Sequence, residues 1–440
     1  MIKMLISMYQ KRESKGGYNM KKKFLSFLVA GCLVGTTAMP GAVMAETEDL
    51  SGTKITFLNT KTEIQDYLED MGKAFEDETG IEIEFYTNTE ENHITEKYAA
   101  GEPYTIMMMD YPDVADYQEY LYDLSNEKWV ADGGEKYGLT LDDKVYGFPF
   151  VIEAMGLIYN ADAIENITGE KFDWKNYSDL ESFKGLLDKL VEGGMESPIA
   201  LNQDDWSLAS HVFGQAYCAR EDGSEAASLA FVDSLKNGEA DLANDEDFNA
   251  IMDLIDVYME YNINKDDPLS ATYDMNDEYL KDGTVAFWPN GSWATDVSEI
   301  TDNVGIMPYP MDTKNDVNSH NLVSGATKML AVDAAYSTEE EQKAALKFLD
   351  WLVYSDYGQN FLVNTCSLIS AFSNNTQEPE AALSASVSEF VKNGQSVYWY
   401  QAMPSDHNTE VGAILQKYIS GAIDRAELIS EVTEYWKKCK

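Results

Sequence analysis

Basic residues are scarce in this chain of 440 residues, because 32 lysines and arginines stand against 77 aspartates and glutamates, for a formal net charge of −45. Binding of nucleic acid depends on Lys and Arg that neutralise phosphates, so nucleic acid is excluded as a partner. The acidic residues are spread along the chain, which is typical of a solvated surface that keeps a secreted protein soluble. Capture of a cationic ligand is the alternative interpretation of this charge.

Cysteine and histidine are also rare, with four residues of each. Cys218, Cys366 and Cys439 are widely spaced, which fits neither a zinc motif nor a dense disulfide framework. At most one disulfide can form among them, and none is required. The histidines are scattered, so they indicate neither a metal site nor a catalytic triad, and we expect no cofactor; they are His93, His211, His320 and His407.

Familiar enzyme signatures are missing from the sequence. It contains no HExxH zinc motif, no GxSxG nucleophile elbow, no phosphate-binding glycine loop and no dinucleotide fingerprint. A glycosidase needs only two carboxylates at a set separation, and so acidic a chain cannot exclude such a pair. A secreted carbohydrate-active enzyme therefore stays open as an alternative.

The N-terminal segment has the layout of an export signal. Met20 begins the motif MKKK, and an apolar run follows over residues 24–39. We therefore predict that Met20 is the true start, that residues 1–19 are untranslated leader and that residues 20–45 form a signal peptide.

Two ways of processing this signal are open. Small residues favour ordinary cleavage after Ala45, which leaves a mature chain of about 395 residues. The alternative is the lipobox VAGC, which would make Cys32 a lipidation site and anchor the protein at the membrane surface. The apolar run continues past Cys32, and this disfavours the alternative. A mature chain of this length is too long for one hydrophobic core, which predicts two lobes.

Periodicity predicts an α/β fold for the start of the mature chain. A short apolar strand over residues 54–58 precedes an amphipathic helix that Gly80 ends, and residues 81–86 alternate as a half-buried strand does. Strand, helix and strand in this order imply a parallel crossover. The apolar positions of the helix are Ile64, Tyr67, Leu68, Met71 and Phe75.

Polar residues follow two of the predicted strands directly. A loop follows the first strand, and two further polar residues follow the apolar run at 105–109. Ligands bind beyond the carboxyl ends of strands in open α/β sheets. This geometry makes five residues candidates for a cleft: Asn59, Thr60, Lys61, Asp110 and Tyr111.

Four segments carry a resemblance to a known family. They are VYGFPFVIEAMGLIYN at 145–160, PIALNQDDW at 198–206, GTVAFWPNGSW at 283–293 and VSGATKMLAV at 323–332, with a helix at 342–353 and a helical tail at 411–440 behind them. Together they resemble the extracellular solute-binding proteins of bacterial ABC sugar importers, the maltose-binding-like family. The resemblance covers nearly the whole mature chain.

The resemblance implies an α/β, two-lobed, periplasmic-binding-protein-like fold with a hinge and a ligand cleft between the lobes. Residues 46–150 plus 303–349 would form lobe 1, and residues 151–302 plus 350–440 would form lobe 2. Pro149 would lie where the chain crosses between the lobes, and its ring would fix one backbone angle at that point.

The resemblance also adds aromatic candidates to the cleft. Trp206 and Trp293 stand where family members place rings against a sugar, while Trp288 departs from the family pattern and could lie in the core or face the ligand. The triplet 398–400 is flanked by a loop and a proline, so at least one of its rings should reach the cleft. The full set of candidate ligand-binding residues is Asn59, Lys61, Asp110, Tyr111, Glu153, Trp206, Trp288, Asn290, Trp293, Gly325, Tyr398 and Trp399. The tryptophans expected to be structural are Trp129, Trp174, Trp351 and Trp436.

The expected function is capture of an oligosaccharide by hinge closure and its delivery to the transmembrane subunits of an ABC permease. Aromatic rings suit the apolar faces of a sugar, and carboxylates and amides suit its hydroxyl rim. The resemblance implies a monomer with no catalytic residue, outside the cell or anchored by lipid at the outer face of the cytoplasmic membrane. A binding protein for a cationic ligand such as a polyamine remains the alternative of the same fold.

Overall fold

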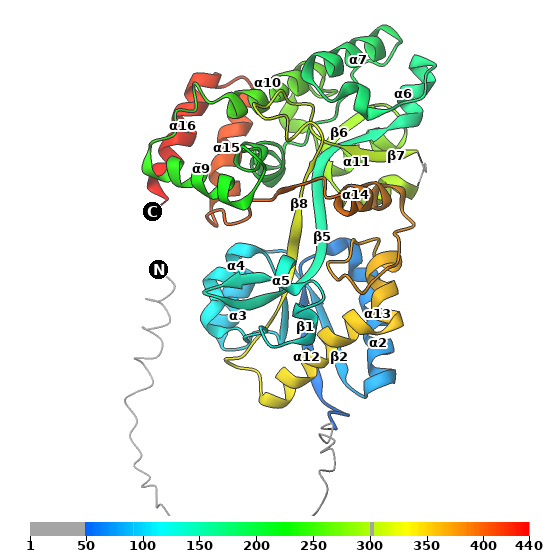
Figure 1. Cartoon of the computed structure of the whole chain (residues 1–440), viewed down its shortest axis with the longest axis vertical. Coiled ribbons are helices and arrows are strands. Elements are labelled where there is room, and N and C mark those ends of the chain that lie inside the picture. The colour runs from blue at the N-terminus through cyan, green and yellow to red at the C-terminus, as the bar shows by residue number, and fades with distance from the viewer. Residues whose placement is uncertain (1–48, 91, 300–302, 440) are drawn as a thin grey trace, which may run out of the picture.

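The computed structural model describes residues 49–90, 92–299 and 303–439. The predicted leader, the signal peptide and Cys32 lie outside these residues. The described chain forms two lobes, with long strands running from one lobe to the other (Figure 1). No described helix is long and apolar enough to cross a membrane.

The first lobe contains the parallel strands that the sequence predicts. β1 (Lys54–Asn59) pairs in parallel with β2 (Glu82–Thr87) on one side and with β3 (Ile106–Met109) on the other. Between β1 and β2 the chain forms a 3-10 turn and then α2 (Leu68–Thr79), which ends at Gly80 with a φ of 73°. The left-handed backbone at this position favours glycine. The predicted α/β class is confirmed.

Helices and short turns cover the strands of the first lobe (Figure 1). Besides α2, the helices of this lobe are α3 (His93–Ala100), α4 (Tyr111–Tyr117), α5 (Gly134–Tyr137), α12 (Glu339–Tyr354) and α13 (Asp356–Asn360). α4 lies at the edge of the lobe that faces the second lobe (Figure 1).

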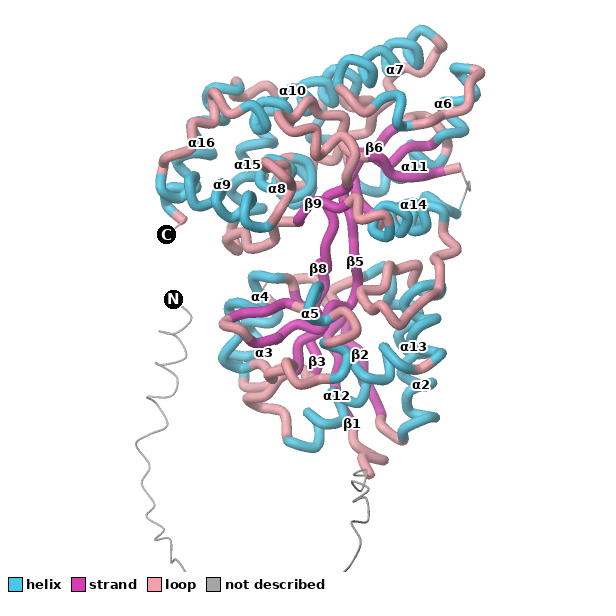
Figure 2. The backbone as a smooth tube through the Cα atoms, viewed as in Figure 1, coloured by secondary structure: helices cyan, strands magenta, loops and turns pink. Residues whose placement is uncertain are grey.

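Two antiparallel strands, β5 (Lys144–Asn160) and β8 (Leu322–Val332), link the lobes (Figure 2). In the first lobe they extend the sheet in the order β2-β1-β3-β8-β5-β4, which ends at β4 (Leu139–Leu141). In the second lobe β5 pairs with β6 (Phe287–Gly291) and β7 (Val304–Met307), and β8 pairs with β9 (Ser396–Tyr398). One sheet therefore runs through both lobes.

The ladder between β5 and β8 is irregular where the strands leave the first lobe. Its register shifts between Pro149 and Val151 and again between Val151 and Ile152. Proline has no N–H to donate, and a bulge bends a strand locally. The ladder between the two linking strands is therefore interrupted at residues 149–152.

The second lobe is mostly helical and has its own apolar core. Its helices are α6 (Ala161–Thr168), α7 (Leu180–Glu192), α8 (Gln215–Cys218), α9 (Glu225–Asn237), α10 (Glu246–Tyr261), α11 (Tyr273–Lys281), α14 (Ala382–Lys392), α15 (His407–Ile419) and α16 (Arg425–Lys438). A π-helical segment at Ser207–Val212 precedes α8.

The structure divides the chain between the lobes differently from the boundaries given above. β7 pairs with Leu157–Asn160 of β5, so the chain directly after residue 303 lies in the second lobe. Conversely, the chain from α12 to about residue 377 stays in the first lobe, where the Phe372 ring lies 5.0 Å from the Phe148 ring and the amide of Asn364 donates to Gln377. The chain recrosses over residues 378–381, since Glu378 already pairs with Lys392 of α14. Both differences depend on contacts between distant segments, which the sequence pattern does not contain.

Three of the four tryptophans expected to be structural are buried, and their rings pack against core residues. Trp129 and Trp436 are fully buried, Trp351 is nearly so, and the partly buried Trp174 lies 5.4 Å from Phe390. The three cysteines among the described residues, Cys218, Cys366 and Cys439, are free thiols.

A buried polar cluster in the second lobe joins α8, α15 and α16. The Tyr217 hydroxyl lies 3.0 Å from Nε2 of His407 and accepts a hydrogen bond of 3.1 Å from Nε1 of Trp436. Burial lowers the pKa of His407 to about 4, so its imidazole is neutral at neutral pH. The unfolded chain holds this histidine at an ordinary pKa of about 6.5.

His407→Gln is expected to make stability less sensitive to acid. Because the folded pKa of His407 lies below the unfolded one, its contribution is complete above about pH 6.5 and is lost as the pH falls toward 4. Between pH 7.5 and pH 5 the wild type should lose about 2 kcal/mol more than the variant. Urea unfolding at both pH values measures this difference, and equal losses would show that His407 is already charged in the folded protein.

Candidate ligand-binding cleft

Four strands end where the two lobes face each other. β1 and β3 run toward the hinge from the first lobe and end at Asn59 and Met109, since β3 is antiparallel to β8. β6 and β9 run toward the hinge from the second lobe and end at Gly291 and Tyr398. The segments that follow these strands therefore meet at one place, as the positions of Lys61 and Asp110 behind their strands predict.

An aromatic cluster forms the second lobe's part of this place. The His211 ring lies 4.4 Å from Trp293, 5.1 Å from Trp206 and 6.0 Å from Trp399, and Trp293 lies 6.3 Å from Trp399. We call these four residues the aromatic cluster. Trp206 and Trp293 are partly exposed, whereas Trp399 is 7% exposed. The sequence predicted the three tryptophans for the cleft, and the structure brings them together; their contact with a ligand remains a prediction.

The turn after β6 requires each residue of the sequence Gly291-Ser292-Trp293. Ser292 fixes the turn on β5, because its N–H donates to the carbonyl of Ala154 and its hydroxyl accepts from the N–H of Ala154 at 3.1 Å. The indole of Trp293 then folds back onto Gly291, where a β-carbon would lie 2.0 Å from the ring. Only glycine leaves room for the ring in this position.

Gly291→Ala is therefore expected to displace the Trp293 ring from the aromatic cluster. A methyl group forced into this buried turn should cost about 1–3 kcal/mol of stability, and we expect ligand affinity to fall about tenfold. Gly185→Ala is the matched control, because a β-carbon at that position in α7 meets no atom within 4 Å. Urea unfolding and calorimetric titration of both variants give the measurement, and equal behaviour would contradict the proposed packing.

His211 is the site residue that sequence analysis missed. It belongs to the π-helical segment Ser207–Val212, which brings it beside Trp206, five positions earlier. A search for the 3.6-residue α-helical period does not connect these two positions, although π-helical turns are frequent at functional sites. Burial lowers the pKa of His211 to about 4, so a neutral imidazole stands among the rings, and its Nδ1 is buried without a hydrogen-bond partner among the described residues.

The base of the cleft holds a buried ion pair between the first lobe and the hinge strand. Nζ of Lys61 lies 2.7 Å from Oε1 of Glu153 and 2.6 Å from Oε1 of Glu63. Glu153 also accepts a hydrogen bond from the hydroxyl of Thr327 on β8. Burial alone would lower the pKa of Lys61, but the two carboxylates outweigh burial and raise it, so Lys61 stays charged. Burial alone would likewise raise the pKa of Glu153, and Lys61 reverses this and lowers it.

Asn59 shapes the loop that carries Lys61. Its side-chain oxygen accepts from the backbone N–H of Lys61 at 3.0 Å, and its amide donates to the carbonyl of the same residue at 2.8 Å. Asn59 is fully buried, so its role here is to position Lys61. Thr60 lies in the same loop and directs its hydroxyl toward the carbonyl of Met108.

A second ion pair joins the hinge to α4. Nζ of Lys328 on β8 lies 2.7 Å from Oδ1 of Asp110, the residue that precedes α4. Burial alone would lower the pKa of Lys328, but Asp110 reverses this and the pKa is raised. Both lysines near the base of the cleft are therefore charged and paired with carboxylates.

Two predicted site residues lie behind the cleft wall. Trp288 is fully buried in the core, its indole N–H donates to Oδ1 of Asn202 at 2.9 Å, and its ring lies 4.9 Å from Tyr273. Asn290 on the same strand is also fully buried. Their assignment to the ligand surface is corrected accordingly, because the middle of β6 is covered on both faces. Trp288, which departs from the family pattern, therefore belongs to the core.

The remaining candidates line one cavity of about 630 Å³ between the lobes, which we call the central cavity. Gly325 on β8 forms part of its floor, opposite Glu153 in the strand ladder. Tyr398 and Trp399 line it from the second lobe, and Tyr111 lines it from the first lobe. Tyr400, the last residue of the triplet, is buried and donates its hydroxyl to the carbonyl of Ala402 at 2.7 Å.

No arrangement of three or more His, Cys, Asp or Glu side chains in the described part of the chain could hold a metal ion.

Comparison with known proteins agrees with this geometry. The sequence profile of a family described as bacterial extracellular solute-binding protein matches residues 70–384. No curated protein matches the chain. RafE in complex with raffinose has a similar fold, with a TM-score of 0.72, 20% identity and coverage of 88% of this chain and 99% of that one. Apo RafE from Streptococcus pneumoniae gives a TM-score of 0.70 at 19% identity, with 88% and 98% covered.

A sugar transporter from Bacillus licheniformis in complex with stachyose is also similar, with a TM-score of 0.66, 18% identity and coverage of 88% of this chain and 100% of that one. At these identities the likeness to solved structures shows the fold, and the profile match over most of the chain shows the family. The chain belongs to the bacterial extracellular solute-binding proteins, the non-enzymatic binding components of ABC transporters.

Proposed function

We propose that this protein captures an oligosaccharide outside the cell and delivers it to the transmembrane permease of an ABC importer. The observation that carries this proposal is the aromatic cluster at the ends of strands that meet between the lobes. Structural neighbours that bind raffinose or stachyose support the same ligand class. Export by the predicted signal peptide and action as a monomer belong to this proposal.

The chemistry of the aromatic cluster suits a sugar. Tryptophan rings supply large apolar faces with a single N–H donor at the edge, which matches the C–H face and hydroxyl rim of a pyranose. A neutral imidazole both donates and accepts hydrogen bonds, as a hydroxyl requires of its partner. His211 is held in this neutral form by burial among the rings.

The base of the cleft is unfavourable for a polyamine. Glu153 is engaged by Lys61 and Thr327, and Asp110 is engaged by Lys328. An amine brought to this base would approach two charged lysines and would have to displace one of them from its carboxylate. The acidity of the chain as a whole therefore does not extend to free carboxylates at the base of the site.

Capture would use rotation at the irregular segment 149–152 of β5. A ligand can favour the closed form only through contacts that differ between the open and closed states, so both lobes must touch it. The second lobe offers the aromatic cluster, and the first lobe offers Tyr111. The closed form would then present both lobes to the permease.

A thermal-shift screen of the mature chain from Glu46 tests the proposal. The panel contains raffinose, stachyose, mannobiose, chitin oligosaccharides and maltooligosaccharides, with spermidine and putrescine included. A ligand at about 100 times its Kd should stabilise the native state by roughly 2.7 kcal/mol and raise the melting temperature by several degrees. We expect a shift with one glycan series that is insensitive to salt. A shift only with polyamines that disappears at high ionic strength would contradict the proposed ligand class.

A further inference from the structure

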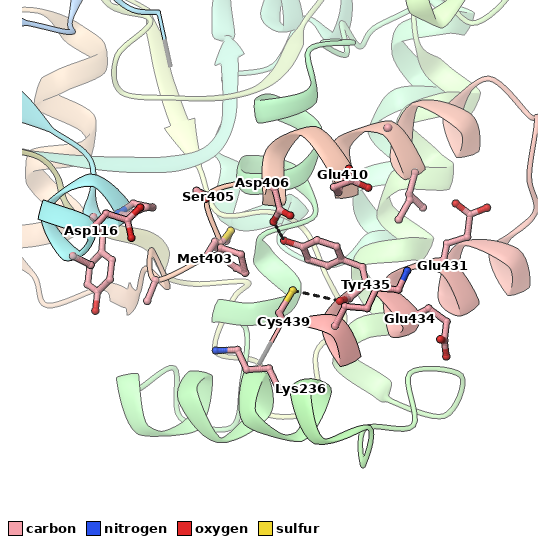
Figure 3. Close-up of a pocket in the computed structure, with 18 of the residues that line it drawn as sticks. Asp116, Lys236, Met403, Ser405, Asp406, Glu410, Glu431, Glu434, Tyr435 and Cys439 are labelled. Carbon is pink, nitrogen blue, oxygen red and sulfur yellow. Dashed lines mark hydrogen bonds between the residues drawn. The ribbon is translucent and has the colours of Figure 1, made fainter. Parts of the chain in front are cut away.

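A second large cavity lies between the lobes beyond the central cavity. It measures about 920 Å³, and α4 of the first lobe lines it opposite α9, α15 and α16 of the second lobe. We call it the outer cavity. Asp116 lies on its first-lobe side, and Asp406, Glu410 and Glu434 lie across from it on the second-lobe side (Figure 3).

The two cavities share walls and therefore adjoin. Tyr111 and Ala402 line both of them, one from each lobe. Trp399 in turn belongs both to the aromatic cluster and to the lining of the central cavity. The cleft thus continues from the aromatic cluster, past Tyr398 and Tyr111, to the gap between α4 and α15.

The character of the lining changes along this course. Four rings stand in the aromatic cluster, and the central cavity is lined by tyrosines together with the charged side chains of Glu135, Lys136 and Glu225. The outer cavity is lined by several carboxylates and lysines, and the hydroxyl of Tyr435 already donates to Asp406 at 2.8 Å. Stacking rings are therefore concentrated in the aromatic cluster, and charged groups that can hydrogen-bond ligand hydroxyls line both cavities beyond it.

The volumes of the two cavities also favour a ligand longer than a disaccharide. Pockets of about 300–1,000 Å³ each hold a drug-sized ligand. The central and outer cavities both fall in this range at about 630 and 920 Å³, and the aromatic cluster lies beside them. A monosaccharide or disaccharide stacked on the cluster would leave most of this connected space to water.

We propose that the ligand is an oligosaccharide of three or more units that stacks on the aromatic cluster and extends past Tyr111 toward the outer cavity. This inference rests on the proposed function and adds ligand length and direction to it. Units beyond the second would be held mainly by hydrogen bonds, with Tyr111 at the passage between the cavities. Each added unit should then gain affinity until the chain has passed Tyr111.

Calorimetric titration of the mature protein with three length series tests this inference. The series are sucrose, raffinose and stachyose; chitin oligomers of two to six units; and mannose oligomers of two to four units. We expect affinity in the recognised series to rise at least tenfold from two units to four. Tyr111→Ala should reduce affinity for the longer members at least tenfold more than for the disaccharide, and Glu410→Gln should reduce affinity for the longest members.

Tyr336→Ala is the matched control, because this tyrosine of the first lobe is 50% exposed and lines neither cavity. It should leave every affinity within twofold of the wild type. Equal affinity for all lengths, or a length effect that survives Tyr111→Ala unchanged, would overturn the extended binding mode and leave sugar capture intact. Absence of binding by every member of all three series, and by the maltooligosaccharides of the thermal-shift panel, would overturn the proposed function as well.

Discussion

Trp293→Ala is expected to weaken binding of the recognised oligosaccharide about 100-fold, on the order of 3 kcal/mol. Trp293 lies beside both His211 and Trp399 in the aromatic cluster, and Gly291 leaves room for its ring. Tryptophans in such central, largely buried positions carry a large share of binding energy, because their truncation removes stacking area and leaves neighbouring groups unsupported. Calorimetric titration gives the dissociation constant directly.

Alanine variants of the other two tryptophans test whether the whole aromatic cluster contacts the sugar. Trp206→Ala and Trp399→Ala should each weaken binding at least tenfold, since both rings lie within about 6 Å of His211. Trp174→Phe is the control, because Trp174 packs on Phe390 outside the aromatic cluster and should leave affinity within twofold. Unchanged affinity in all three alanine variants would rule out the aromatic cluster as the sugar platform.

Lys61→Met is expected to cost about 3 kcal/mol or more of folding stability. The variant removes the cation that compensates Glu153, which is nearly fully buried at the base of the cleft. A charge left alone in such a place must either stay uncompensated or take up a proton at a cost in free energy. Urea unfolding at pH 7.5 measures the loss. Because Lys61 holds the pKa of Glu153 low, the loss should become smaller as the pH falls and Glu153 takes up a proton.

Matched variants separate this effect from general loss of a lysine. Lys54 forms an ion pair of similar length with Glu82, but both side chains are well exposed, so Lys54→Met should cause no measurable change. The double variant Lys61→Met/Glu153→Gln should recover much of the lost stability, since no charge is then left unpaired between these two positions. Equal stability of Lys61→Met and Lys54→Met would contradict the description of the cleft base.

The parts of the fold that depend on local pattern could be predicted from the sequence. The alternation of residues 81–86 and the helical spacing that ends at Gly80 are properties of neighbouring residues, and the structure confirms both elements. The positions of Lys61 and Asp110 followed as well, because the end of a parallel strand fixes the edge of the sheet at which the next residue lies.

The parts that depend on distant contacts could not be predicted. His211 reaches Trp293 through a π-helical turn, and no regular period indicates such a turn. The burial of Trp288 depends on Asn202, which is distant in sequence and supplies the acceptor for its indole N–H. The observed lobe boundaries differ from the expected ones for the same reason. The pairing of β7 with β5 is a contact between segments almost 150 positions apart.

A crystal structure of the mature chain, grown with the oligosaccharide that stabilises it most, tests sugar capture between the lobes most directly. We expect one sugar ring to lie against Trp293 or Trp399, further units to extend past Tyr111, and the lobes to be rotated toward each other about the segment 149–152. An oligosaccharide bound to the outer surface of one lobe, with the aromatic cluster free of sugar, would contradict capture between the lobes.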